Sequence, residues 1–141
     1  MRALGGMLSL LGLGLLAGGM LFFAAVAAPL VFSRLPAPVG GPFIRAMFPW
    51  LYGYCLICAG MSALGYALRR RLGAALVPGF VALATLWAWL WLMPRLDAWR
   101  LAGDTAAFAH GHRVSTWVYG LELAAVLALL LREGARASRR G

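Results

Sequence analysis

The chain has 141 residues, of which 63% are hydrophobic and 12% charged, and its mean hydropathy is +0.84. This small number of charged side chains cannot cover the exterior of a soluble domain of this length. The composition therefore indicates an integral membrane protein. The net charge of +9 comes from arginines at the ends of apolar segments, which favours anionic lipid headgroups over nucleic acid as the partner.

Four apolar stretches are each long enough to cross a bilayer as a helix: residues 5–33, 46–68, 73–93 and 114–131. About 20 residues of α-helix cross the hydrocarbon core, where the backbone must satisfy its own hydrogen bonds. The stretches show no strand-like alternation, and Glu122 is the one charged residue inside them. We therefore predict a single all-α integral membrane domain over residues 1–141, folded as a four-helix transmembrane bundle.

The first stretch follows Arg2 and ends in the small residues AAVAAP, a pattern that a secretory signal peptide can also show. Its apolar run is longer than the core of such a signal, and three further spans follow it. We therefore expect this stretch to stay in the protein as a membrane helix.

The arginines predict which way the bundle faces. With four spans, the side of the termini holds Arg2, Arg69, Arg70, Arg71, Arg132, Arg136, Arg139 and Arg140. The opposite side holds Arg34, Arg45, Arg95, Arg100 and Arg113, offset by Asp97 and Asp104. Because basic residues accumulate on the cytoplasmic side, we predict that both termini are cytoplasmic, in a bacterial inner membrane.

The two connections on the outer side have different characters. Residues 34–45, RLPAPVGGPFIR, are rich in proline and glycine and predict a tight loop. Residues 95–112 predict a short amphipathic helix between spans three and four, with Asp97 and Arg100 three residues apart on its polar face. Pro94 is expected to end the third span, and the basic tail at 132–141 is expected to be disordered.

A polar stripe runs along the fourth span. Spacings of i, i+3, i+7 and i+10 place four residues on one helix face: His112, Ser115, Tyr119 and Glu122. An acid inside a membrane is costly and usually faces the bundle interior, where burial favours its protonated form. Glu122 is therefore a candidate for carrying a proton or binding a cation. The structural alternative is a hydrogen bond from Tyr54, Tyr66 or Tyr119.

Two pairs of residues are candidate metal ligands. Cys55 and Cys58 lie one turn apart on span two and would suit a soft ion such as Cu(I), although packing by small, polarizable side chains explains them more simply. His110 and His112 could bind a metal together only in an extended segment. The first three spans contain no histidine, so one chain cannot ligate haem through two histidines on different helices. We predict no cofactor and keep copper or haem as alternatives.

A small-residue motif, Gly14-x-x-x-Gly18, lies in the first span. Such spacing permits close helix packing in membranes, either within the bundle or between copies in a homo-oligomer. The same glycine-rich span could also pack on a partner if the chain is an accessory subunit of a membrane complex.

Four short motifs occur in order along the chain: APLVFSRLP, MFPWLYGY, MPRLDAW and FAHGHRVS. Together they resemble the four-helix membrane proteins grouped around transmembrane protein 205, a family of unknown function. The resemblance implies that Phe48-Pro49, Pro94-Arg95, and His112 with Ser115 are family positions on the outer side. Tyr119 stands where that family often has asparagine, and Glu122 has no family counterpart.

These observations predict an outward-facing polar pocket that binds, or helps to transport, a small ligand or ion. Its predicted lining residues come from spans two, three and four: Phe48, Pro49, Tyr52, Arg95, His112, Arg113, Ser115, Tyr119 and Glu122. The two arginines would favour anionic groups, and transport would require an oligomer because four helices enclose little volume. No catalytic motif appears, so we do not expect an enzyme.

Overall fold

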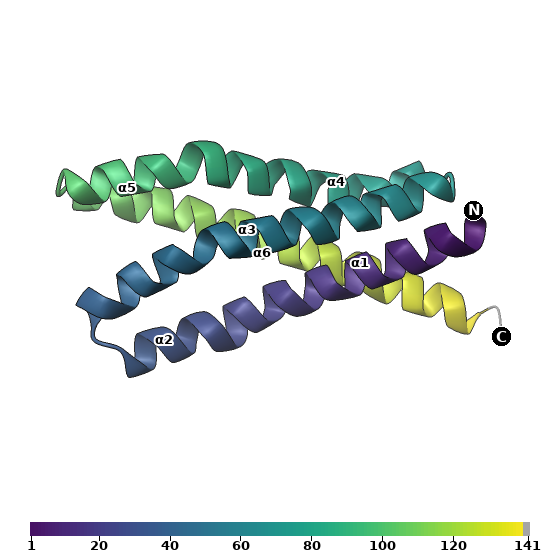
Figure 1. Cartoon of the computed structure of the whole chain (residues 1–141), viewed down its shortest axis with the longest axis horizontal. Helices are drawn as coiled ribbons and strands as arrows, with labels where there is room; N and C mark the ends of the chain where they lie inside the picture. The colour runs from purple at the N-terminus through teal and green to yellow at the C-terminus, as the bar shows by residue number, and fades with distance from the viewer. Residues whose placement is uncertain (140–141) are drawn as a thin grey trace.

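The structure, a computed structural model, describes residues 1–139, and every regular element among them is helical (Figure 1). Within this range, four helices are long and apolar enough to cross a membrane: Ala3–Arg34, Ala37–Leu68, Leu72–Leu101 and Thr105–Ser138. At 1.5 Å per residue, helices of this length exceed a hydrocarbon core of about 30 Å. The predicted all-α, four-helix membrane bundle is confirmed.

The first and third spans each contain one turn of π-helix. The first consists of α1 (Arg2–Phe22), η1 (Phe23–Ala27) and α2 (Ala28–Arg34). The third consists of α4 (Leu72–Trp87), η2 (Ala88–Leu92) and α5 (Met93–Leu101). The other two spans are α3 (Ala37–Leu68) and α6 (Thr105–Ser138).

Each π turn ends two residues before a proline. The Ala28 N–H donates to the Phe23 carbonyl before Pro29, and the Met93 N–H donates to the Ala88 carbonyl before Pro94. Proline lacks an N–H and its ring clashes with the carbonyl four residues earlier, so a wider turn accommodates it without ending the helix. The expectation that Pro94 ends the third span is therefore wrong.

The connections are shorter than the sequence predicted. Only Leu35 and Pro36 lie between α2 and α3, so the predicted loop over 34–45 is wrong. Proline is tolerated in the first helical turn, which explains why α3 can begin at Ala37 with Pro38 next. The expected short helix after span three exists as α5, but it continues α4 instead of forming a separate element.

The turn between α5 and α6 covers only residues 102–104. Gly103 adopts a φ of +71°, a left-handed conformation that glycine adopts without strain. Asp104 caps α6 by accepting a hydrogen bond from the Ala107 N–H at 3.0 Å. Residues 105–112, which we predicted to lie in the outer loop, thus form the start of α6.

The basic tail is ordered where we predicted disorder. α6 continues to Ser138 because Glu133 is buried and accepts hydrogen bonds from Arg71 and Arg136. The predicted disorder is wrong for residues 132–138, and residues 140 and 141 lie outside the described part of the chain.

Close approach of α1 and α3 depends on glycine. A Cβ on Gly12 would lie 2.7 Å from the backbone nitrogen of Ser62, and a Cβ on Gly65 would lie 2.3 Å from that of Ser9. No described atom lies within 4 Å of a Cβ placed on Gly14 or Gly18. The predicted motif therefore does not pack within the bundle, and its role between copies stays a prediction.

The two ends of the bundle are distinct (Figure 1). Both termini and the α3–α4 turn lie at one end, here called the termini end, and the other two connections lie at the distal end. At the distal end, Arg45 on α3 pairs with Asp97 on α5, with Nε at 2.8 Å from Oδ1. Arg100 also lies 3.6 Å from Asp97, three residues earlier on the same helix.

Candidate functional site

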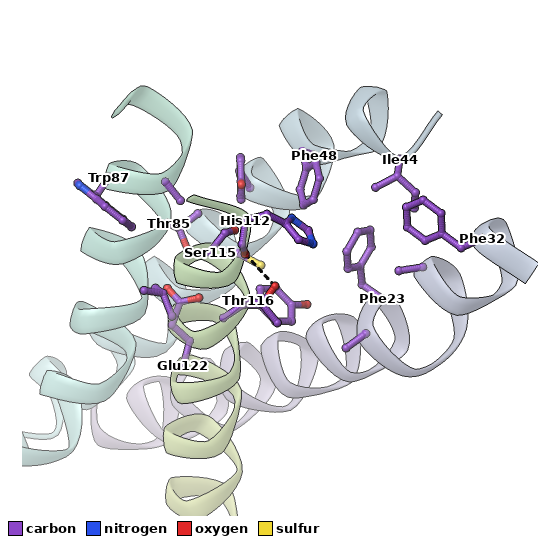
Figure 2. Close-up of a pocket in the computed structure, with 17 residues that line it drawn as sticks. Phe23, Phe32, Ile44, Phe48, Thr85, Trp87, His112, Ser115, Thr116 and Glu122 are labelled. Carbon is purple, nitrogen blue, oxygen red and sulfur yellow. Dashed lines mark hydrogen bonds between the residues drawn. The ribbon is translucent and has the colours of Figure 1, made fainter. Parts of the chain in front are cut away.

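A cavity of about 310 Å³ lies between all four spans, in the distal half of the bundle (Figure 2). The first span contributes Phe23, Ala24, Ala28 and Phe32, and α3 contributes Ile44, Phe48, Tyr52 and Cys55. The third span contributes Thr85, Trp87 and Ala88, and α6 contributes His112, Ser115, Thr116, Val118, Tyr119 and Glu122.

Both π turns contribute to this cavity. Phe23 and Ala24 belong to η1, and Ala88 belongs to η2. A π turn shifts the following residues around the helix axis and is common at functional sites. Pro29 and Pro94 therefore influence the cavity through the backbone without lining it.

Aromatic side chains form a continuous wall. The rings of Phe48 and Tyr52 stack with centroids 5.6 Å apart, and Phe23 lies 5.7 Å from Phe48 and 6.3 Å from Tyr119. Aromatic and aliphatic side chains together make up eleven of the seventeen lining residues. The cavity is thus more apolar than the polar pocket that the sequence predicted.

Glu122 is the only carboxyl group among the described residues of the lining. Its side chain is 4% exposed, and its Oε1 atom has no hydrogen-bond partner among residues 1–139. In Figure 2 it leans from α6 toward the helix that carries Thr85 and Trp87. A buried polar atom without a partner costs about 1–3 kcal/mol.

None of the three tyrosines proposed as partners of Glu122 donates a hydrogen bond to it. The Tyr54 hydroxyl donates to the Leu15 carbonyl at 2.6 Å, and the Tyr119 hydroxyl donates to the Met20 carbonyl at 2.9 Å. The Tyr66 hydroxyl is buried and has no partner in the described chain. The structural alternative for Glu122 is therefore not observed.

The polar stripe of span four faces the cavity. All four residues of the stripe line the cavity, with His112 exposed at one end of the stripe and Glu122 buried at the other. The His112 ring stacks on Phe108 at 6.0 Å with an interplanar angle of 5°. The backbone carbonyl of His112 accepts a hydrogen bond from the Thr116 hydroxyl at 2.9 Å, drawn in Figure 2.

Six of the nine predicted lining residues meet here: Phe48, Tyr52, His112, Ser115, Tyr119 and Glu122. The structure places Pro49, Arg95 and Arg113 outside the cavity, all three exposed. The Arg95 guanidinium lies 3.6 Å from the centroid of the Trp91 ring, a cation–π contact at the surface. The expected preference for anions therefore lacks the arginines on which it depended.

The candidate metal ligands do not form a cluster. Cys55 lines the cavity, whereas Cys58 and His110 do not, and both cysteines are free thiols. Over residues 1–139, no three His, Cys, Asp or Glu side chains gather in a way that could hold a metal ion. No such group of side chains therefore supports the copper or haem alternative, which stays a prediction.

Several lining residues escaped the sequence analysis. Thr85 had a detectable signal, because it is the only hydroxyl-bearing residue in span three. Phe23, Ala24 and Trp87 had none, since they lie in uniformly apolar stretches in which every helix face looks alike.

Four long apolar helices and a cavity enclosed between them define an integral membrane protein with an intramembrane pocket. The chain belongs to the DUF4149 family, a domain of unknown function, whose family model matches residues 11–104. The match covers most of the first span and all of the second and third, while the lining residues of α6 lie beyond it. No curated protein and no solved structure matches the chain.

Proposed function

We propose that this protein binds a small, mainly apolar molecule that carries a hydrogen-bond donor or a positive charge, in the cavity between its four spans. The observation that supports this proposal is the unpartnered Oε1 atom of Glu122 in a cavity whose walls are mainly aromatic and aliphatic. The walls would stabilise an apolar body, and a donor on the ligand would remove the cost of the unmade hydrogen bond.

The volume and the rim support a ligand that arrives from the bilayer. A cavity of about 310 Å³ is at the lower end of the range for small-molecule sites. Phe32, His112 and Thr116 line the cavity and are also exposed on the outside of the helices. A molecule that partitions into the membrane would therefore meet this rim before it met Glu122.

Transport of that ligand is the wider form of the proposal. It would require a second copy of the chain, because four helices enclose little volume. We place the bundle in a bacterial inner membrane with both termini cytoplasmic, on the strength of the arginine distribution. We also propose a relationship to the transmembrane protein 205 group. It rests on Phe48-Pro49, Pro94-Arg95 and His112.

A matched ligand series tests the binding proposal. The purified protein in lipid nanodiscs would be titrated with 3-phenylpropylamine, 3-phenylpropanol and 3-phenylpropanoate, with the thermal unfolding midpoint and calorimetric affinity as readouts. We expect the amine to bind best, the alcohol next and the carboxylate least. Losing a hydrogen bond to a charged group should weaken amine binding about tenfold in Glu122→Leu.

Two variants separate this role from a general effect on the fold. Glu122→Gln keeps an acceptor carbonyl, so it should retain the alcohol and lose the preference for the amine. Arg113→Gln, an exposed change on the same helix outside the cavity, should leave all three affinities unchanged. Equal binding of amine and carboxylate, or unchanged amine binding in Glu122→Leu, would refute the proposal.

A further inference from the structure

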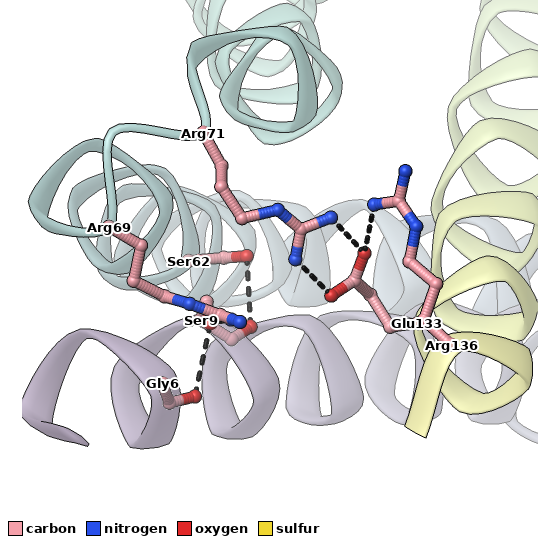
Figure 3. Close-up of polar contacts among 7 residues, drawn as sticks. All are labelled: Gly6, Ser9, Ser62, Arg69, Arg71, Glu133 and Arg136. Atoms are coloured by element: carbon pink, nitrogen blue, oxygen red, sulfur yellow. Dashed lines mark hydrogen bonds and ion pairs between the residues drawn. The ribbon is translucent and has the colours of Figure 1, made fainter. Parts of the chain in front are cut away.

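A second cavity, of about 530 Å³, opens at the termini end, where the α3–α4 turn meets the last turns of α6 (Figure 3). Four arginines line it: Arg69 and Arg71 from the turn, and Arg136 and Arg139 from the C-terminal end of the chain. Glu133 is the one acidic residue of the lining. The binding site proposed above does not include any of these residues.

Three of the four guanidinium groups are held in place by neighbours. Arg71 donates to Glu133 Oε1 at 2.6 Å, and Arg136 donates to the same oxygen at 3.3 Å. Arg69 donates to the Ser9 hydroxyl at 3.0 Å, and that hydroxyl donates to the Gly6 carbonyl (Figure 3). The hydrogen bonds that Arg71 donates to Glu133 also raise the pKa of Arg71 above its usual range, so this guanidinium stays charged.

These contacts leave the cavity strongly positive. Among the described lining residues, one carboxylate faces four guanidinium groups, which leaves three positive charges uncompensated. Both oxygens of Glu133 already accept hydrogen bonds, whereas each guanidinium has further N–H donors that its protein partners do not use. Ordered guanidinium groups with free donors suit the oxygens of a phosphate group.

The position of the cavity suggests the source of that phosphate. Arg69 directly follows the last apolar residue of α3, and Glu133 lies two residues beyond Leu131 on α6. Side chains at the ends of apolar spans lie at the depth of the lipid headgroups. We propose that this cavity is a discrete binding site for a phosphate group, supplied by the headgroup of an anionic phospholipid.

Lipid retention tests the site with a matched pair of double variants. Protein from nanodiscs of equimolar phosphatidylcholine and phosphatidylglycerol would be moved into detergent, and the lipids that stay bound would be counted by native mass spectrometry. Arg69→Gln with Arg139→Gln removes two charges from the cavity. Arg70→Gln with Arg132→Gln removes two exposed charges from the same end, outside the cavity.

We expect the wild type and the control pair to retain phosphatidylglycerol over phosphatidylcholine, and the cavity pair to lose about tenfold of that preference. If the Arg69 change impairs folding, Arg139→Gln alone should still reduce retention.

A second arm adds inorganic phosphate to lipid-free protein. Phosphate could raise the unfolding midpoint of the control pair but not of the cavity pair, while neither pair retains lipid. That result would overturn the lipid as the source and assign the phosphate site to a soluble ligand. Equal losses in both pairs, or no response to either anion, would overturn the proposal.

Discussion

Two glutamates on α6 show how differently one residue type can be buried. Glu122 and Glu133 are eleven residues apart, which is three helical turns, and both face the bundle with 4% and 7% exposure. Glu133 accepts hydrogen bonds from Arg71 and Arg136, whereas Oε1 of Glu122 has no partner in the described chain. Burial therefore contributes to stability at one position and costs stability at the other.

This contrast predicts stability changes of opposite sign. Glu122→Leu should raise the free energy of unfolding by about 1 kcal/mol, since it removes an unpartnered acceptor. Glu133→Leu should lower it by roughly 2 kcal/mol, because two arginines lose their partner at a partly exposed site. Equilibrium unfolding in mixed micelles measures both changes. A loss of stability in Glu122→Leu would reveal a structural role for that carboxyl group.

At the scale of the elements, α1 and α3 pack through small residues and polar contacts to the backbone. Gly12 and Gly65 allow backbone contact, and the Ser62 hydroxyl donates to the Ser9 carbonyl at 3.2 Å. Lipid tails are as apolar as leucine, so membrane helices associate through such close packing and not through the hydrophobic effect. The spacing of glycines alone does not say which of them meet a partner helix.

Alanine substitutions at two neighbouring glycines should therefore differ sharply. Gly12→Ala should cost about 2 kcal/mol of unfolding free energy, because its Cβ would meet the backbone of Ser62. Gly14→Ala has open space and should be neutral, or stabilising by up to about 1 kcal/mol through helix propensity. The same unfolding assay compares them, and similar effects of the two changes would contradict the observed packing of α1 on α3.

At the scale of the whole molecule, ion pairs connect neighbouring spans at both ends, and the apolar cavity lies between them. Arg45 and Asp97 connect α3 to α5 at the distal end, and Arg71 and Glu133 connect the α3–α4 turn to α6 at the termini end. Charged groups are costly in hydrocarbon but are tolerated where helices emerge into the headgroups. Because both ends carry such ion pairs, the predicted orientation in the membrane rests on the surplus of arginine at the termini end.

Cysteine labelling tests that orientation. Ala102→Cys lies in the distal turn and Arg132→Cys at the termini end, and both positions are exposed. In spheroplasts, a membrane-impermeant maleimide should label Ala102→Cys directly and Arg132→Cys only after permeabilisation. The native cysteines are each 3% exposed, so the unmodified protein is the background control. The reverse pattern would place both termini outside.

Patterns along the chain were enough to predict the membrane class, the number of spans and the helix face that borders the cavity. Hydrocarbon imposes a minimum length and internal hydrogen bonding on each span, so apolar runs identify helices without any knowledge of packing. Helical periodicity likewise placed the residues from His112 to Glu122 on one face. Both inferences depend only on local geometry.

The ends of the helices and the surroundings of each polar group depend instead on how the four spans pack together. Pro94 does not end span three, because the π turn before it accommodates the proline ring. The basic tail is helical because Glu133 pairs with Arg71, which is distant in the sequence. The missing partner of Glu122 Oε1 within the described chain and the exclusion of Arg95 from the cavity likewise depend on which helices meet. Contacts between residues far apart in the chain set these features, and a pattern read along one helix does not contain them.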